Sequence, residues 1–118
     1  MQQLAGQLNE LCASAPYRIG WSVRHFPSGW SANREGDTVF PSMSTRKIAI
    51  LMQAFKGVNE GRSSLEQPVR LDKVNQDSGG VFQYLSRGLT ITLHDALVMM
   101  IIVSDNTCTS HVASLVGL

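Results

Sequence analysis

The sequence has few cysteines and no metal-binding motif. Only two cysteines occur in 118 residues, Cys12 and Cys108, and no CxxC or Cys/His pair has the spacing of a zinc site. An unpaired cysteine commonly behaves as a small apolar side chain. We therefore expect two free, buried thiols rather than a disulfide, no metal and no cofactor.

The chain also has little net charge and no long apolar run. Ten basic and nine acidic residues give a formal charge of +1 without a run of either sign, so the cationic surface that nucleic acid requires is not expected. The longest apolar stretch, 97–103, is far shorter than the roughly 18 residues of a membrane span and predicts a buried helix. The N-terminus has no basic start followed by an apolar block, so no signal peptide is recognised and the compartment stays unknown.

What is present favours one domain with a helix and a hairpin at its start. The hydrophobic content of 43% over 118 residues is enough for one core. Leucines recur at helical spacing over 2–14 and predict an amphipathic helix. Apolar and polar residues alternate over 17–24, and a Pro-Ser-Gly turn with a second strand completes a predicted β-hairpin over 17–33.

The next segment, 42–58, predicts a second helix. Its apolar residues are too crowded to leave a wide polar face, so we expect this helix to be buried nearly all round. The polar stretch that follows, as far as Gly80, is expected to be loop with one short turn.

The remaining segment, 81–117, is predicted to be a helical region that begins with a brief helix around 81–85, before Gly88. Thr92, with an acidic residue three positions on, resembles a capping pair and opens one helix. A last helix, 108–116, is expected to be capped by Asn106 or Thr107. The chain as a whole is therefore expected to be α+β, mostly helical with an N-terminal hairpin.

Ser44 and Lys47 carry the first chemical signal. They lie three residues apart at the start of helix 42–58, a spacing that places both side chains on one face. A serine hydroxyl needs an adjacent base to become nucleophilic, and a lysine serves when desolvation lowers its pKa. The backbone N–H groups at the helix start can hold the oxyanion of an attacked carbonyl. Taken alone, however, Ser-x-x-Lys is a weak signal, because a capped helix start with a solvated lysine has the same composition.

The second signal is Ser104-Asp105-Asn106, which follows Ser44 by 60 residues at the end of an apolar helix. The two motifs together belong to the signature of serine β-lactamases and penicillin-binding proteins. Segments 40–47 and 89–107 resemble the nucleophile segment and the second-motif helix of class A β-lactamases, and 77–85 is similar to the loop between them. The resemblance implies a β-lactamase-like α+β fold, with 1–118 as the N-terminal portion of one domain that lacks the C-terminal strands.

The resemblance also implies roles for individual residues. Ser44 would attack a lactam or ester carbonyl, Lys47 would help to remove its proton, and Ser104 would carry a proton to the leaving nitrogen. Asn106 would bind the substrate's side-chain amide and Lys47, whereas Asp105 is expected to be structural. Penicillin-binding peptidases and esterases carry the same motifs, so they stay as alternatives. The family further implies a periplasmic or secreted location.

Two parts of the family pattern do not occur in this sequence. No Lys-Thr-Gly or Lys-Ser-Gly string is present, and Glu60 and Glu66 do not match the position of the deacylating glutamate. We therefore expect the 118 residues alone to be poorly active or inactive. Because a two-stranded hairpin leaves its edges unpaired, we expect a complementing C-terminal fragment, or self-association by domain swapping. The rival hypothesis is a truncated, non-catalytic fragment or assembly scaffold.

The possible roles of four other polar residues are less definite. The spacing of His25, His94 and His111 matches no metal or triad motif, so we expect ordinary histidines. Arg46, inside the Ser-x-x-Lys motif, either is a solvated helix residue or contacts an acidic group outside these residues, and the sequence does not choose between them.

Overall fold

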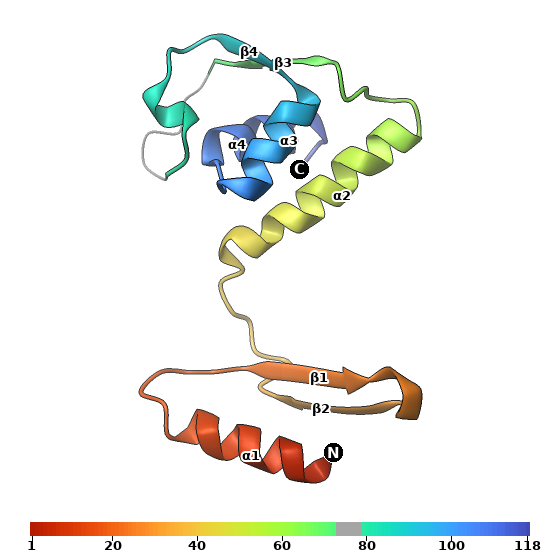
Figure 1. Cartoon of the computed structure of the whole chain (residues 1–118), viewed down its shortest axis with the longest axis vertical. Helices are drawn as coiled ribbons and strands as arrows, with labels where there is room; N and C mark the ends of the chain where they lie inside the picture. Colours follow the sequence, from red (N-terminus) through yellow and green to blue (C-terminus); the bar gives the residue numbers. More distant parts are fainter. Residues whose placement is uncertain (73–78) are drawn as a thin grey trace. The chain divides into compact units, whose positions relative to one another are not determined.

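A computed structural model describes residues 1–72 and 79–118. The chain divides into two compact units, Met1–Pro41 and Ser42–Leu118 (Figure 1). The residues of the Ser-x-x-Lys and Ser-Asp-Asn motifs all belong to the second unit.

The first unit is one helix and one hairpin. Helix α1 (Gln2–Ala13) confirms the predicted N-terminal helix. Strands β1 (Trp21–His25) and β2 (Trp30–Arg34) pair antiparallel and confirm the hairpin. The first strand is shorter than predicted: its ladder begins at Trp21, and Tyr17, which is 70% exposed, precedes it.

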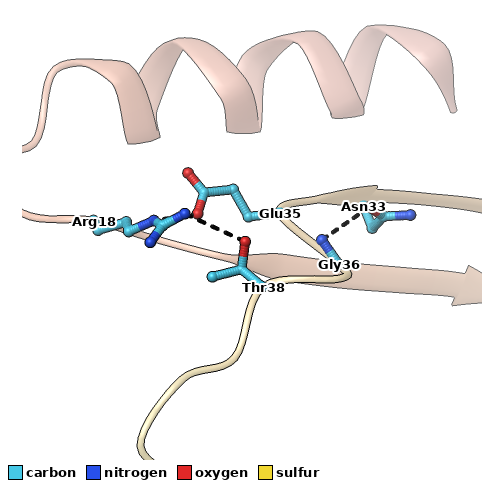
Figure 2. A network of polar contacts seen from close by, with 5 residues as sticks. All are labelled: Arg18, Asn33, Glu35, Gly36 and Thr38. Carbon is cyan, nitrogen blue, oxygen red and sulfur yellow. Dashed lines mark hydrogen bonds and ion pairs between the residues drawn. The ribbon is translucent and has the colours of Figure 1, made fainter.

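A polar network lies where the chain leaves β2 (Figure 2). Arg18 forms an ion pair with Glu35 and donates a hydrogen bond of 3.3 Å to the Thr38 hydroxyl. The side-chain oxygen of Asn33 accepts from the backbone N–H of Gly36 at 3.2 Å. Glu35 has a φ of +55°, a region that non-glycine residues seldom adopt. The network therefore holds a tight turn, although exposed ion pairs of this kind contribute only about 0–1 kcal/mol each.

In its described residues, the second unit holds three α-helices and one further strand pair. Its helices are α2 (Arg46–Asn59), α3 (Leu93–Ile102) and α4 (Asn106–Leu115). Strands β3 (Pro68–Leu71) and β4 (Leu89–Thr92) pair antiparallel, and both strands contact α3 (Figure 1). The expected brief helix is a single 3₁₀ turn, Phe82–Tyr84.

The core of this unit lies where the three helices meet β3. Its largest fully buried apolar side chains are Leu71, Leu93, Met100 and Val112. Burying each such side chain contributes about 1.5–3 kcal/mol. Cys108 is buried among them as a free thiol, and Cys12 is buried and free in the first unit, as predicted.

The pairing of β3 with β4 corrects two predictions. The segment before Gly80 was expected to be loop and 81–117 to be helical, yet Val69 lies opposite Ile91 and Leu71 opposite Leu89. The strand has four residues, too few for its alternation to stand out in the sequence. Its partner strand is distant in sequence, and its buried side chains, Val69 and Leu71, belong to the core that the helices complete. Residues 77 and 78, part of the loop that resembles the family, lie outside the described residues.

Helix α2 corrects another prediction, since it is not buried nearly all round. Ile50 and Ala54 face the core, but the side chains of Ile48, Met52 and Phe55 are 58%, 68% and 48% exposed. Within the second unit α2 packs on α3 and α4 along one face only. Among the described residues, no helix combines the length and the apolar character that crossing a bilayer requires.

Candidate active site

Ser44 lies at the entrance to α2. The sequence predicted a helix from residue 42, but Met43–Thr45 forms a 3₁₀ turn and the α-helix begins at Arg46. Met43 has a φ of +47°, which is uncommon for a residue with a side chain. The turn still leaves Ser44 and Lys47 close to one another at the helix N-terminus.

Hydrogen bonds join the two predicted motifs into one cluster. The hydroxyl oxygens of Ser44 and Ser104 are 2.9 Å apart. The Lys47 amine donates to the Ser104 hydroxyl at 2.8 Å, to the Ser104 carbonyl at 2.6 Å and to the side-chain oxygen of Asn106 at 2.8 Å. The Ser104 hydroxyl therefore lies between Lys47 and Ser44, a bridge that the spacing of the first motif did not predict.

Lys47 is buried in this cluster, with only 3% of its surface exposed. Loss of hydration disfavours the ammonium form, so burial lowers the pKa of Lys47 below its ordinary value. The Asp105 carboxylate opposes this shift and the Arg46 guanidinium adds to it. A lysine whose neutral form is favoured in this way is suited to accept a proton.

The backbone around Ser104 forms a sharp corner. Ser104 has a φ of +57°, and the N–H of Asp105 donates to the Met99 carbonyl at 3.1 Å. Asp105 is fully buried and caps α4 by accepting from the N–H of Cys108 at 2.9 Å. The predicted caps, Asn106 and Thr107, are therefore wrong. The reason is that Asp105 has extended backbone angles, as a capping residue does, and Asn106 is already helical.

The second oxygen of Asp105 holds the loop that precedes the short 3₁₀ turn. It accepts from the N–H groups of Val81 at 2.7 Å and Phe82 at 2.9 Å. Gly80 lies against this carboxylate with a φ of +117°, and a Cβ there would be 2.3 Å from the oxygen. Sequence reasoning did not single out Gly80. The available signal was the pair of glycines directly ahead of a short helix.

Buried Asp105 also affects Cys108. Burial, followed by the neighbouring carboxylate and its hydrogen bond, raises the pKa of this thiol to about 12. Cys108 therefore stays a neutral thiol near neutral pH, because its thiolate would be unstable there.

An open cavity of about 360 Å³ adjoins the cluster. Its walls come from the 3₁₀ turn, the start of α2 and the start of α4, and they contain Ser42, Met43, Ser44, Arg46, Lys47 and Asn106. The nucleophile candidate and the buried amine thus reach the same space, where a carbonyl compound can approach Ser44.

The three histidines make local contacts elsewhere. His25 contacts Ser28 at 2.7 Å, His94 contacts Asp95 at 3.1 Å and His111 contacts the Thr107 carbonyl at 2.8 Å. In the described part of the chain, no three His, Cys, Asp or Glu side chains gather as metal ligands would.

Comparison with known proteins gives matches over almost all of this chain. The profile of the beta-lactamase enzyme family matches residues 3–118. PBP-A is 30% identical with a TM-score of 0.86, and a mutant of it was solved as an acyl-enzyme complex with penicillin G. A β-lactamase from Sphaerobacter thermophilus is 34% identical over 84% of this chain, with a TM-score of 0.71. No curated protein sequence matched.

These solved relatives are longer than the present chain. It covers 45% of PBP-A and 37% of the Sphaerobacter enzyme, while 99% of it aligns with PBP-A. The aligned segments are helical with short antiparallel strand pairs, which confirms the predicted β-lactamase-like α+β fold class. Since the family profile spans both units and both motifs, the chain belongs to the beta-lactamase enzyme family.

Proposed function

We propose that Ser44 is the nucleophile of a serine hydrolase that opens a β-lactam amide through an acyl-serine intermediate. The observation that carries the proposal is the line of hydrogen bonds from the buried Lys47 amine through the Ser104 hydroxyl to the Ser44 hydroxyl. Family membership supports hydrolase chemistry in general. We further propose that both units belong to one β-lactamase-like domain.

The proposed reaction uses this line to move one proton. Neutral Lys47 accepts a proton from the Ser104 hydroxyl, which in turn accepts the proton of Ser44. The Ser44 oxygen then bonds to the lactam carbonyl carbon, and the carbon–nitrogen bond of the ring breaks. The proton returns through Ser104 to the leaving nitrogen. Asn106 holds Lys47 and binds the substrate's side-chain amide, and Asp105 fixes the corner.

Turnover is a separate step in the proposal. Release of the acyl group needs an activated water, and the sequence holds no residue that matches the family's deacylating glutamate and no Lys-Thr-Gly string. The solved relatives are more than twice as long, since the chain covers 45% of PBP-A. We propose that the 118 residues alone acylate slowly and do not turn over, and that a complementing segment restores hydrolysis.

A penicillin-binding peptidase or esterase is the second candidate function. It is favoured by the similarity to PBP-A, whose mutant was solved as an acyl-enzyme with penicillin G. The two candidates share the acylation step and differ in which acyl-enzyme is hydrolysed. With a complementing segment supplied to restore turnover, comparing release of a penicilloyl group with release of a D-alanyl peptide acyl group separates them.

Acylation is tested by incubating the protein with a fluorescent penicillin and locating the adduct by peptide mass spectrometry. We expect a single adduct on Ser44, no adduct in Ser44→Ala, and wild-type labelling in the matched control Ser86→Ala, whose exposed residue lies outside the cavity. An adduct that persists in Ser44→Ala contradicts the proposal. So does the absence of labelling when a complementing C-terminal segment is supplied.

Lys47 is tested by the rate of the same reaction. Removing a general base typically slows a step by about 10²–10⁴-fold, and we expect Lys47→Ala to slow acylation by that order. Lys56→Ala is the control, because Lys56 is exposed on the same helix. An unchanged rate in Lys47→Ala removes Lys47 from the mechanism.

A further inference from the structure

The turn that carries Ser44 contains a residue in an unfavourable backbone conformation. Met43, directly before Ser44, has a φ of +47°, whereas Ser42 before it and Thr45 after Ser44 have right-handed helical angles. The left-handed region brings Cβ close to the following carbonyl oxygen, so a residue with a side chain adopts it at a cost in free energy. Contacts within the turn must therefore hold Met43 in this conformation.

Two hydrogen bonds close the turn around Met43 and Ser44. The carbonyl oxygen of Ser42 accepts from the backbone N–H of Thr45 at 3.0 Å and also from the Thr45 hydroxyl. Closure of a four-residue turn fixes the backbone angles of its two central residues together. The backbone of Ser44 therefore keeps its orientation only while Met43 stays left-handed.

The partner of the Ser44 hydroxyl belongs to a second residue of this kind. Ser104 has a φ of +57°, and its hydroxyl oxygen is 2.9 Å from that of Ser44. Apart from glycines, the described part of the chain has one further residue with a left-handed φ, Glu35, in a turn of the first unit. Two of these three residues thus lie at the contact between Ser44 and Ser104. Strained backbone commonly gathers at catalytic sites, where surrounding contacts hold the reacting groups in place.

We propose that Met43 is a positioning residue for the acylation step, and that it acts through its left-handed backbone rather than through its thioether side chain. The conformation of Met43 lets the turn close, the closed turn orients Ser44, and the Ser44 hydroxyl then reaches that of Ser104. Met43 also belongs to the wall of the cavity beside Ser44, so a contact between its side chain and the substrate is the rival explanation. The inference rests on the proposed function, because it assigns a role in the acylation of Ser44.

Substitutions of Met43 separate the two explanations, because tolerance of the left-handed region and side-chain size rank residues differently. Glycine adopts a positive φ without steric cost and asparagine tolerates it, whereas the branched Cβ of isoleucine opposes it. We expect Met43→Gly and Met43→Asn to keep acylation of Ser44 by a fluorescent penicillin within about threefold of the wild-type rate. Met43→Ile should slow it by about tenfold, and Met43→Leu, whose Cβ is unbranched, should stay close to the wild type.

Thermal unfolding supplies a readout that does not need substrate. Relief of strain should raise the unfolding midpoint of Met43→Gly above that of the wild type, and Met43→Ile should unfold at a lower temperature than Met43→Leu. The matched control is Met52→Ile, because Met52 lies on α2 outside the walls of the cavity. We expect this control to label Ser44 at the wild-type rate.

Three results would contradict the inference and leave Ser44 as the nucleophile. If Met43→Leu and Met43→Ile acylate fast while Met43→Gly and Met43→Asn are slow, the role belongs to the side chain. Equal rates in all four variants would show that Met43 does not position Ser44, and a lower midpoint of Met43→Gly than of the wild type would show that the turn is not strained. If wild-type Ser44 carries no adduct even with a complementing segment supplied, the proposed function fails and the inference fails with it.

Discussion

At the scale of single residues, Lys47 owes its chemistry to its surroundings. The chain has ten basic residues, and in the sequence Lys47 differs from the others only by its place at the start of a predicted helix, three residues after Ser44. In the structure the residue is 3% exposed, and its amine donates to three oxygens, two of Ser104 and one of Asn106. Burial lowers its pKa, while the three acceptors keep the amine in one place. The spacing predicted that Lys47 lies near Ser44. It did not predict that burial would lower the pKa of Lys47 while three acceptors hold its amine.

The direction of the Lys47 shift gives a pH prediction. Acylation should rise with pH as Lys47 loses its proton and level off above its pKa, which lies below the ordinary 10.5. Initial labelling rates from about pH 5 to about pH 10 measure this. Lys56→Ala should give the same profile as the wild type, and a rate independent of pH over that range contradicts the prediction.

The same shift affects stability with a definite sign. In the unfolded chain Lys47 holds its proton up to about 10.5, whereas in the folded chain it releases the proton at lower pH. Between the two pKa values the unfolded state binds more protons, so the free energy of unfolding contributed by Lys47 increases with pH. Urea unfolding of the wild type and of Lys47→Met across this window should show the difference in slope.

At the scale of elements, the corner between α3 and α4 is held to the loop before the short 3₁₀ turn. Asp105 connects the two by accepting from the N–H groups of Val81, Phe82 and Cys108. Removing a buried acceptor of this kind leaves several N–H groups unsatisfied, at about 1–3 kcal/mol each. The position of Ser104, directly before Asp105, therefore depends on a segment that lies far from it in the sequence.

Gly80 and Gly79 offer a matched test of this contact. Both have positive φ, +117° and +79°, but a Cβ at Gly80 would be 2.3 Å from the Asp105 carboxylate and one at Gly79 would meet nothing within 4 Å. Gly79→Ala should lose only about 1 kcal/mol from backbone strain. Gly80→Ala should lose at least about 1 kcal/mol more and slow acylation of Ser44, because the corner must shift.

Urea unfolding followed by circular dichroism, with labelling of Ser44 on the same samples, measures both effects. Equal losses of stability in Gly79→Ala and Gly80→Ala would show that the Asp105 contact is not tight in solution.

At the scale of the whole molecule, the second unit leaves an apolar stripe of α2 uncovered by its own residues. Ile48, Met52 and Phe55 recur at helical spacing and are each about half exposed or more. Contiguous exposed apolar patches on soluble proteins commonly mark interaction surfaces. The stripe is therefore a surface on which either a complementing segment or a second copy of the chain can pack, and both stay predictions.

Met52 and Met100 test the stripe with the same substitution. Met52 is 68% exposed and Met100 is fully buried. We expect Met52→Lys to change the free energy of unfolding of the 118-residue chain by less than about 0.5 kcal/mol and to reduce its association in sedimentation velocity. Met100→Lys should unfold the second unit, because it buries an unpaired charge. A large loss of stability in Met52→Lys would show that this part of α2 is covered in solution.

The sequence by itself determined the local structure and the residue types of the site. Leucine spacing predicted α1, alternation predicted the first hairpin, and Thr92 was correctly predicted to cap α3. The pair of motifs predicted the family, which the matches confirm. Each of these features depends on contacts within a few residues or on the identity of side chains. The catalytic roles assigned to Ser44 and Lys47 stay predictions.

Only the tertiary structure decided the contacts between distant segments. It paired β3 with β4, placed the Ser104 hydroxyl between Lys47 and Ser44, and made Asp105 rather than its neighbours the cap of α4. It also decided which face of α2 is covered. The physical reason is that burial and hydrogen-bond partners are properties of packed surfaces. Apolar periodicity shows which side chains can be buried, but the partner that covers them comes from another part of the chain.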